Sequence, residues 1–355
     1  MEVCLMDVPF SEWYAAIGRR RSRRQFSPQP VEPTWLERME TVCESFRPYP
    51  EARAVLVNRP ANEVLKGIVG SYGQVKGAPA YVALVGDTRS PYVQERVGYT
   101  GEAVVLEATA LGLATCWVGG FFRPEVAARL LGVGEGEQAM AVIPFGYPGR
   151  HTWEESLMTG FVHSHRRQPL SRLTAGEGDW PRWVEAALEA ARLAPSAMNR
   201  QPWRFSVEAV PGGGRAITVR VAGGPDNGIS RRLDCGIAML HIEVAALAHG
   251  VRGTWEPLAP PLVARFAQSQ GKTGGAHAGQ GGNQVVPHAG HPEGQEEERP
   301  SHARRYQSRK EDDCPCGSGH LPRPRRQVME ISAPRTEIGA GFSARYTAIG
   351  GGGAL

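Results

Sequence analysis

The chain has 355 residues, of which 41% are hydrophobic, and its formal net charge at pH 7 is +4. This length and apolar content suit one large domain or two smaller ones with a substantial core. So small a charge does not by itself argue for a nucleic-acid partner. The sequence contains no run of 18 apolar residues and no signal-peptide pattern at its N-terminus, so we expect a cytoplasmic protein without a membrane partner.

The first half of the chain predicts an alternation of helices and strands. Apolar residues at helical spacing predict helices at 11–21, 33–46, 61–71 and 92–113. Strands are predicted at 52–58, within 77–87, at TCWVGGF (115–121) and within 137–148. The helix at 92–113 has a continuous face of apolar and small residues, which predicts that it packs inside the domain.

The second half repeats part of this order. An amphipathic helix is predicted at 180–193, followed by the strands WRFSVEAV (203–210) and AITVRVAG (216–223). A second helix rich in small residues follows at 234–251, and its composition matches that of the helix at 92–113. A segment with a tryptophan comes after each of them. We therefore expect an α+β fold made of two related halves, with mixed or antiparallel sheets flanked by helices.

The composition changes at about residue 261. Segments such as GKTGGAHAGQGGNQ and HPEGQEEERP lack apolar periodicity and cannot bury enough surface to offset the entropy of ordering. We predict a folded body over 1–260 and a mostly disordered tail over 261–355. The tail segment CPCGSG resembles the start of a zinc-binding SEC-C motif, but Cys314, Cys316 and His320 supply at most three ligands. We therefore predict no metal site.

Two segments of the body have unusual chemistry. RRRSRR (19–24) places five arginines and one serine at a predicted helix end, and guanidinium groups bind phosphate in a bidentate manner. A solvated basic face is the alternative for this run. RLAPSAMNRQPWRF (192–205) combines small residues, prolines and amides. A capped helix start would explain its serine and prolines, but it leaves Asn199 and Gln201 without a role.

Together these segments resemble the FMN-dependent nitroreductase family over about residues 11–258. The first motif is R-R-S-x-R with a later Pro-Val turn, and the second is A-P-S-x-x-N-x-Q-P-W at 194–203. TCWVGGF, IPFGYPG and RRQPL (166–170) also resemble later parts of that family. Ordinary members are homodimers that carry both motifs early in one chain, whereas here the motifs lie in different halves.

This separation of the motifs resembles the fused subgroup called TM nitroreductases, in which one chain mimics the dimer. The resemblance implies a nitroreductase-like half over 1–170, a reduced second half over 171–260, and a monomer. It also implies one complete FMN site between the halves. The first half would supply the residues that hold the phosphate, the polar edge of the ring and the reactive face: Arg20, Arg21, Ser22, Arg24, Gly119 and Gly120.

The second motif would line the same site from the other half. Its residues would be Pro195, Ser196, Ala197, Asn199 and Gln201, with fixing the loop as the alternative role for Gln201. Arg166 or Arg167 would complete the phosphate end. Gly119 and Gly120 would allow a close approach of the backbone to the flavin, which a Cβ atom would obstruct.

The implied reaction passes hydride from NADH or NADPH to FMN and then to a nitroaromatic, quinone or related small acceptor. The cofactor performs this chemistry without a side-chain acid or base, so the sequence identifies no catalytic residue. Two alternatives stay open. The chain could be a flavin-binding protein without activity, or an interaction protein whose nitroreductase site is degenerate.

Overall fold

The computed structural model describes residues 9–65, 75–120, 122–150, 166–175, 178–226 and 228–269. The chain divides into two units, residues 1–277 and 278–355, and every described residue belongs to the first. Most of the expected tail, with Cys314, Cys316 and His320, therefore lies outside the described residues. None of the helices in the described ranges combines the length and apolar character that crossing a membrane requires.

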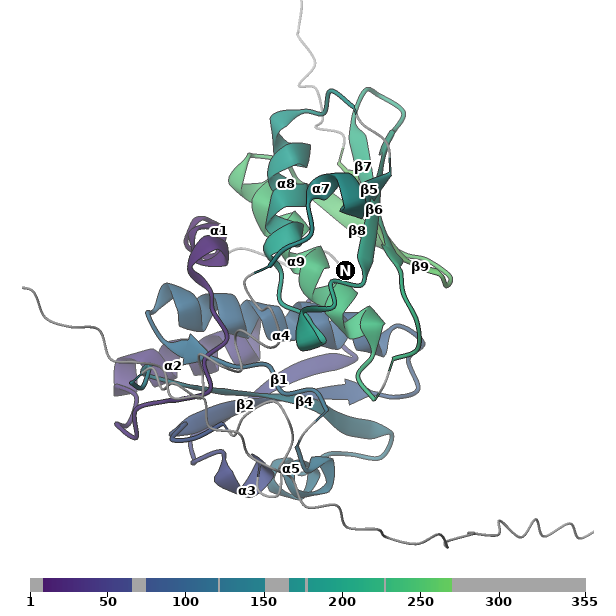
Figure 1. Cartoon of the computed structure of the whole chain (residues 1–355). Coiled ribbons are helices and arrows are strands. Elements are labelled where there is room, and N and C mark those ends of the chain that lie inside the picture. The colour runs from purple at the N-terminus through teal and green to yellow at the C-terminus, as the bar shows by residue number, and fades with distance from the viewer. Residues whose placement is uncertain are drawn as a thin grey trace, which may run out of the picture. The chain divides into compact units, whose positions relative to one another are not determined.

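The first half contains a four-stranded antiparallel sheet with the strand order β1-β2-β4-β3 (Figure 1). Its strands are β1 (Ala52–Val57), β2 (Ala80–Asp87), β3 (Ala114–Thr115) and β4 (Glu137–Gly146). Successive side chains of a strand point to opposite faces, and both faces of β2 are covered. Val82 and Leu84 therefore join one buried cluster, whereas Tyr81 and Ala83 join another.

The helices of this half largely follow the predicted ranges. They are α1 (Phe10–Arg19), α2 (Pro33–Ser45), α3 (Asn62–Leu65), α4 (Val93–Ala110) and α5 (Pro124–Leu131). Helix α5 was not predicted, although its sequence carries both end signals. Pro124 occupies its first turn, and Gly132 ends it in the left-handed conformation, with φ 59°.

The second half contains a five-stranded sheet with the order β5-β6-β7-β9-β8. Its strands are β5 (Thr174–Ala175), β6 (Trp203–Ala209), β7 (Arg215–Val221), β8 (Gly253–Pro257) and β9 (Leu262–Gln268). Its helices are α7 (Leu170–Leu173), α8 (Arg182–Leu193) and α9 (Arg231–Ala248). All neighbouring strands are antiparallel except β5 and β6, which are parallel.

Strand β9 corrects the expected end of the folded body at residue 260. It lies between β7 and β8 in the sheet, and its Val263 and Phe266 side chains are fully buried. The sequence places this segment at the start of the tail because the composition loses its apolar periodicity from about residue 261. Burial of its apolar face keeps the chain in the core as far as Gln268.

The two sheets share one connectivity. In the first sheet, the antiparallel strands β1 and β2 are followed by the buried helix α4, the edge strand β3 and then β4, which inserts between β3 and β2. In the second sheet, β6 and β7 are followed by the buried helix α9, the edge strand β8 and then β9, which inserts between β8 and β7. Both sheets also have a register shift after the fifth residue of the second strand, between Leu84 and Val85 in β2 and between Val219 and Arg220 in β7. Each shift skips one residue of the partner strand.

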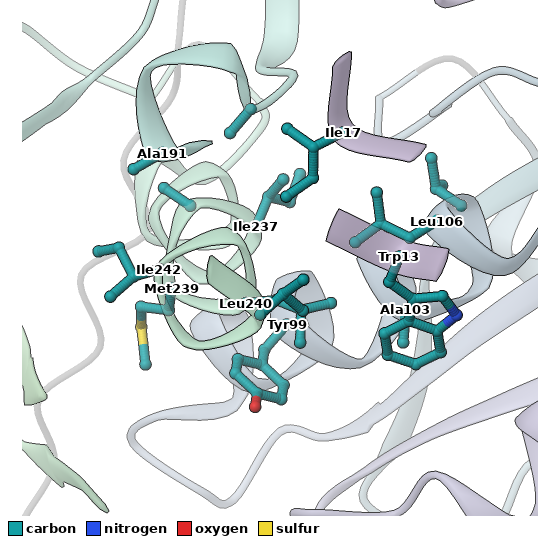
Figure 2. Close-up of a cluster of buried hydrophobic side chains, with 14 of the residues drawn as sticks. Trp13, Ile17, Tyr99, Ala103, Leu106, Ala191, Ile237, Met239, Leu240 and Ile242 are labelled. Carbon is teal, nitrogen blue, oxygen red and sulfur yellow. The ribbon is translucent and has the colours of Figure 1, made fainter. Parts of the chain in front are cut away.

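The main hydrophobic core lies where helices of both halves meet. Helices α4 and α9 pack along each other, α1 contacts both of them, and α8 packs on α9. Figure 2 shows Trp13 and Ile17 of α1 beside Leu106 of α4 and Ile237 of α9. The prediction that α4 and α9 are buried is confirmed, since most of their residues are inaccessible.

Candidate functional site

The arginine cluster at 19–24 follows the end of α1 and runs beside β3. The amide of Arg23 donates to the carbonyl oxygen of Thr115 at 2.9 Å, and the amide of Lys76 donates to that of Arg24 at 2.8 Å. Ser22 forms an isolated parallel bridge with Thr115. These backbone bonds attach the cluster to the first sheet. Arg21 and Ser22 are exposed, and Arg24 is partly exposed.

Arg20 differs from the other arginines of the cluster because it is buried, with 6% of its surface exposed. Its Nη1 lies 3.5 Å from Ser22 Oγ, and its Nε has no hydrogen-bond partner within the described part of the chain. Burial lowers the pKa of the guanidinium, although the negative charge of Glu102 acts in the opposite direction. A buried guanidinium with a spare donor is the arrangement that an anionic ligand would complete.

The second motif forms a loop at 194–201, and this corrects the alternative of a capped helix start. Helix α8 ends at Leu193, before the motif, and a single 3₁₀ turn (Ala197–Asn199) follows within the loop. Pro195 is buried, and Ser196 Oγ accepts the amide of Gln201 at 2.9 Å. The hydroxyl group therefore closes the loop on itself.

Asn199 and Gln201, which the helix-start interpretation left without a role, hold the segment 166–168 against this loop. The Nδ2 of Asn199 and the Nε2 of Gln201 both donate to the carbonyl oxygen of Arg166, at 2.8 and 3.1 Å. Gln201 Oε1 accepts the amide of Gln168 at 2.8 Å. The guanidinium of Arg167 donates to Asn199 Oδ1 and, at 3.3 Å, to the carbonyl oxygen of Leu193.

Arg167 connects the two motifs electrostatically. Burial and then the positive charges of Arg20, Arg192 and Arg21 lower its pKa to about 10. Mutual repulsion of this kind requires the charges to lie near one another. The arginine cluster of the first half and the 194–201 loop of the second, far apart in the sequence, therefore face one region of the fold.

Gly119 and Gly120 reach the same loop through Ile229. A Cβ atom on Gly120 would lie 2.7 Å from Ile229 Cγ1, and one on Gly119 would lie 3.4 Å from Ile229 Cγ2. The carbonyl oxygen of Ile229 in turn accepts Nη2 of Arg200, a residue of the loop, at 2.9 Å. A side chain at position 120 would therefore have to displace the end of the Ile229 side chain.

A buried polar network behind this region was not predicted. Trp117 Nε1 donates to Glu102 Oε2 at 2.8 Å, and His241 Nε2 lies 2.9 Å from Glu102 Oε1. Glu102 and His241 are both fully buried, and His241 Nδ1 lies 2.8 Å from the carbonyl oxygen of Ala190. The network fixes Trp117, two residues before Gly119, to helices of both halves. A glutamate on the face of apolar and small residues of α4 was the signal that could have revealed it.

Comparison with known proteins identifies the family. The model of the family described as "Putative TM nitroreductase" matches residues 12–246, which is more than half of the chain. The chain belongs to this family. The expected α+β architecture of sheets flanked by helices is present in the described residues, and the resemblance found in the motifs is confirmed. No curated protein matches the chain.

Several solved structures resemble the chain at low sequence identity. A "putative nitroreductase" from Thermotoga maritima is 20% identical, covering 72% of this chain and 92% of its own, with a TM-score of 0.47. A nitroreductase family protein from Clostridium difficile is 21% identical over 47% of this chain and 98% of its own, with a TM-score of 0.36. A Bacteroides fragilis nitroreductase with bound FMN is 20% identical over 40% and 90% of the two chains, with a TM-score of 0.32.

Proposed function

We propose that this nitroreductase family member is an FMN-dependent oxidoreductase. It would pass hydride from NADH or NADPH through the flavin to a nitroaromatic, quinone or related small acceptor. The observation that carries the proposal is the convergence of Arg20 and Arg21 from one half with Arg167 and the 194–201 loop from the other. The cytoplasmic location and monomeric state expected from the sequence belong to the same proposal.

The residues present fit the phosphate of FMN. A phosphate dianion needs several cationic donors, and the guanidinium groups of Arg20, Arg21 and Arg167 would supply them, with the Glu102 carboxylate as the opposing charge already present. Arg20 supports this fit because its Nε is buried and without a hydrogen-bond partner in the described residues. Leaving such a donor unpaired costs about 1–3 kcal/mol, which a phosphate oxygen would recover.

We assign the binding roles as follows. The arginine cluster would hold the phosphate and the polar edge of the ring, through Arg20, Arg21, Ser22 and Arg24. Arg166 and Arg167 would close the phosphate end. From the other half, Pro195, Ser196, Ala197 and Asn199 would line the ring, and Gly119 and Gly120 would leave room at its reactive side. Gln201 would act indirectly, since its amide is engaged in bracing the loop against residues 166–168.

When bound, FMN would supply the hydride chemistry by accepting a hydride from the nicotinamide and giving it to the acceptor. The protein's own part would be binding and electrostatics. The arginine cluster at the polar edge of the ring would stabilise negative charge that develops there, more effectively than in water because Arg20 is buried. No side chain is required to carry a proton, so we name no catalytic acid or base.

We further infer that the chain is a fused pseudo-dimer, with one half over about 1–170 and the other from 171 to the end of β9. The shared strand order and the matching register shifts support this relationship. The division of the two motifs between the halves supports it independently. In a homodimer both motifs are repeated, whereas here each half keeps only the part that the other lacks.

The fused arrangement would leave one FMN site per chain. In the first half, the segment before β1 corresponds to the 194–201 loop before β6, but it carries aromatic residues in place of serine and amides. Phe46 stacks on Tyr99 with ring centroids 5.9 Å apart, and Tyr49 packs edge-on to Tyr99 at 5.3 Å. The Arg96 guanidinium covers the Tyr49 ring at 5.2 Å. These packed rings support the absence of a second site.

Reconstitution of the purified full chain with FMN tests the proposal. After unbound flavin is removed, the protein should keep a flavin absorption spectrum, and it should oxidise NADH or NADPH when a quinone or nitroaromatic is added. A chain that retains no flavin after reconstitution would contradict the proposal. Retained flavin without oxidation of either nucleotide would favour the alternative of a flavin-binding protein.

A further inference from the structure

The Arg200 side chain ties the 194–201 loop to two other segments. Its Nε donates to Asp234 Oδ2 on α9 at 2.6 Å, its Nη2 to the carbonyl oxygen of Ile229 at 2.9 Å, and its Nη1 to that of Asp226 at 3.1 Å. All three nitrogens of the guanidinium therefore donate hydrogen bonds. The planar guanidinium directs them to three separate acceptors, which the single ammonium group of a lysine could not reach together.

Asp234 holds the same loop at a second point. Its Oδ1 accepts a hydrogen bond from the backbone amide of Ala197 at 3.0 Å, and its Oδ2 accepts one from Arg200 Nε. Both carboxylate oxygens therefore bind the loop. The Asp234 side chain is only 2% exposed. Burial raises its pKa to about 6 even though Arg200 opposes the shift. An ionised carboxylate is thus kept in the interior where the loop meets α9, although burial disfavours its charge.

The backbone of the loop explains why it needs such restraint. Met198, Asn199 and Gln201 have φ values of 54°, 54° and 47°, in the left-handed region that residues with side chains rarely adopt. Conformations of this kind persist only where the surroundings fix them. Asp234 binds the residue that precedes this stretch, and Arg200 lies within it.

The restraint extends to the first half of the chain. Ile229, whose carbonyl oxygen accepts Arg200, packs its side chain against Gly119 and Gly120. A displacement of Arg200 would therefore move Ile229 relative to the glycine pair. One buried ion pair thus links the two segments that would face the flavin from opposite halves.

We propose that Arg200 and Asp234 are positioning residues for FMN. They set the separation between the 194–201 loop and the Gly119–Gly120 segment, and so preform the site before the cofactor enters. Neither residue needs to touch FMN, because both act through Ala197, Ile229 and the backbone of the loop. The inference rests on the proposed function, since it concerns the shape of that same site.

A second buried ion pair on α9 provides a matched control. Arg232 donates to Glu95 Oε1 and Oε2 on α4 at 2.5 and 3.0 Å, and the Glu95 side chain is 4% exposed. Arg232 also binds the carbonyl oxygen of Leu262 at 2.9 Å. Glu95 and Arg232 have no hydrogen bond to the 194–201 loop among the described residues. E95Q therefore makes the same change from carboxylate to amide as D234N, with comparable burial and no link to the site.

The test compares FMN binding to D234N, R200K, E95Q and the unmodified chain by fluorescence titration at pH 8. D234N should weaken FMN binding roughly tenfold or more, because the partly buried Arg200 loses its charged partner. R200K keeps the charge but loses the fork to Ile229 and Asp226, so it should give a smaller loss. E95Q should stay within about twofold of the unmodified chain even if its thermal stability falls as far as that of D234N.

Two further measurements separate positioning from a loss of stability. The visible circular dichroism of FMN at saturation should change in D234N and not in E95Q, because it reports the surroundings of the ring. Amide hydrogen exchange without FMN should accelerate in 196–201 in D234N and not in E95Q. If the unmodified chain binds no FMN, the proposed function fails and this inference fails with it. If it binds FMN and D234N matches it in affinity and spectrum, only the positioning role is overturned.

Discussion

Gly98 of α4 lies directly against the backbone of Leu233 in α9: a Cβ atom on Gly98 would overlap the Leu233 carbonyl oxygen. The reverse contact also exists, since a Cβ atom on Gly236 of α9 would overlap the carbonyl oxygen of Glu95 in α4. Both helices have 18 residues, and in each the glycine is the sixth residue and the carbonyl belongs to the third. The two helices therefore cross with an approximate two-fold relationship.

This crossing predicts that alanine at either glycine destabilises the protein. G98A or G236A would push the two buried helices apart, and overpacking of this kind costs about 1–3 kcal/mol. The measurement is urea unfolding of each variant. G18A is the control, because Gly18 is also helical but no atom lies within 4 Å of its missing Cβ. An equal loss in G18A, or none in G98A and G236A, would show that the backbones are not in close contact.

The same crossing shows what the sequence predicted well. The small and apolar faces of α4 and α9 predicted two buried helices of similar composition, and the structure confirms both. Strand β9 was missed, because a run of seven residues (Leu262–Gln268) between prolines and a glycine-rich stretch offers little periodicity to detect. Its burial depends on β7 and β8, which are contributed by other parts of the chain.

The candidate site was predicted only in outline. The arginine cluster and the A-P-S-x-x-N-x-Q-P-W motif pointed to two segments that meet, but this expectation came from family resemblance and not from local physical chemistry. The Arg200–Asp234 pair joins a loop to a distant helix, so no spacing in the sequence reveals it. The available signal was an aspartate that directly precedes the apolar run of α9, since a buried charge requires a partner.

Residues of both halves should contribute to FMN affinity. R20A removes a buried guanidinium from the proposed phosphate position, and a hydrogen bond to a charged group is worth about 1.5–3 kcal/mol, or roughly tenfold to a hundredfold in Kd. N199D removes the Nδ2 donor to Arg166 and adds a negative charge within the proposed site of an anionic cofactor, so it should also weaken binding. The measurement is fluorescence titration with FMN.

R89A is the control for these two variants. Arg89 is exposed and pairs with Asp87, and it contacts none of the proposed FMN residues in the described structure. Its removal should leave the dissociation constant unchanged. If R20A or N199D also binds FMN with unchanged affinity, that residue has no part in the site. Loss in one variant alone would confine the site to one half.

The fused arrangement predicts one FMN per chain. When the apoprotein is titrated with FMN and binding is monitored by the quenching of flavin fluorescence, the end point should come at one FMN per chain. The first half cannot offer a second site, because Phe46 and Tyr49, which precede β1 in the sequence, pack their rings against Tyr99 of α4. Sedimentation of the holoprotein should give the mass of a single chain. An end point of two would contradict the pseudo-dimer proposal.

Acid should remove one stabilising contribution from the first sheet. Arg53 of β1 donates to both carboxylate oxygens of Glu137 in β4, at 3.0 and 2.7 Å, and these bonds lower the Glu137 pKa from 4.5 to about 2. A carboxyl group whose pKa falls on folding stabilises the protein above its unfolded pKa, and this contribution disappears as the pH falls through the folded value. E137Q should therefore be less stable than the unmodified chain at pH 7, and the difference should shrink between about pH 4.5 and 2.

Urea unfolding across this pH range measures the difference in stability. E208Q is the control, because the Glu208 side chain is 53% exposed and its pair with Arg265 is worth little. A difference that stays constant with pH would show that Glu137 acts through packing and not through its charge.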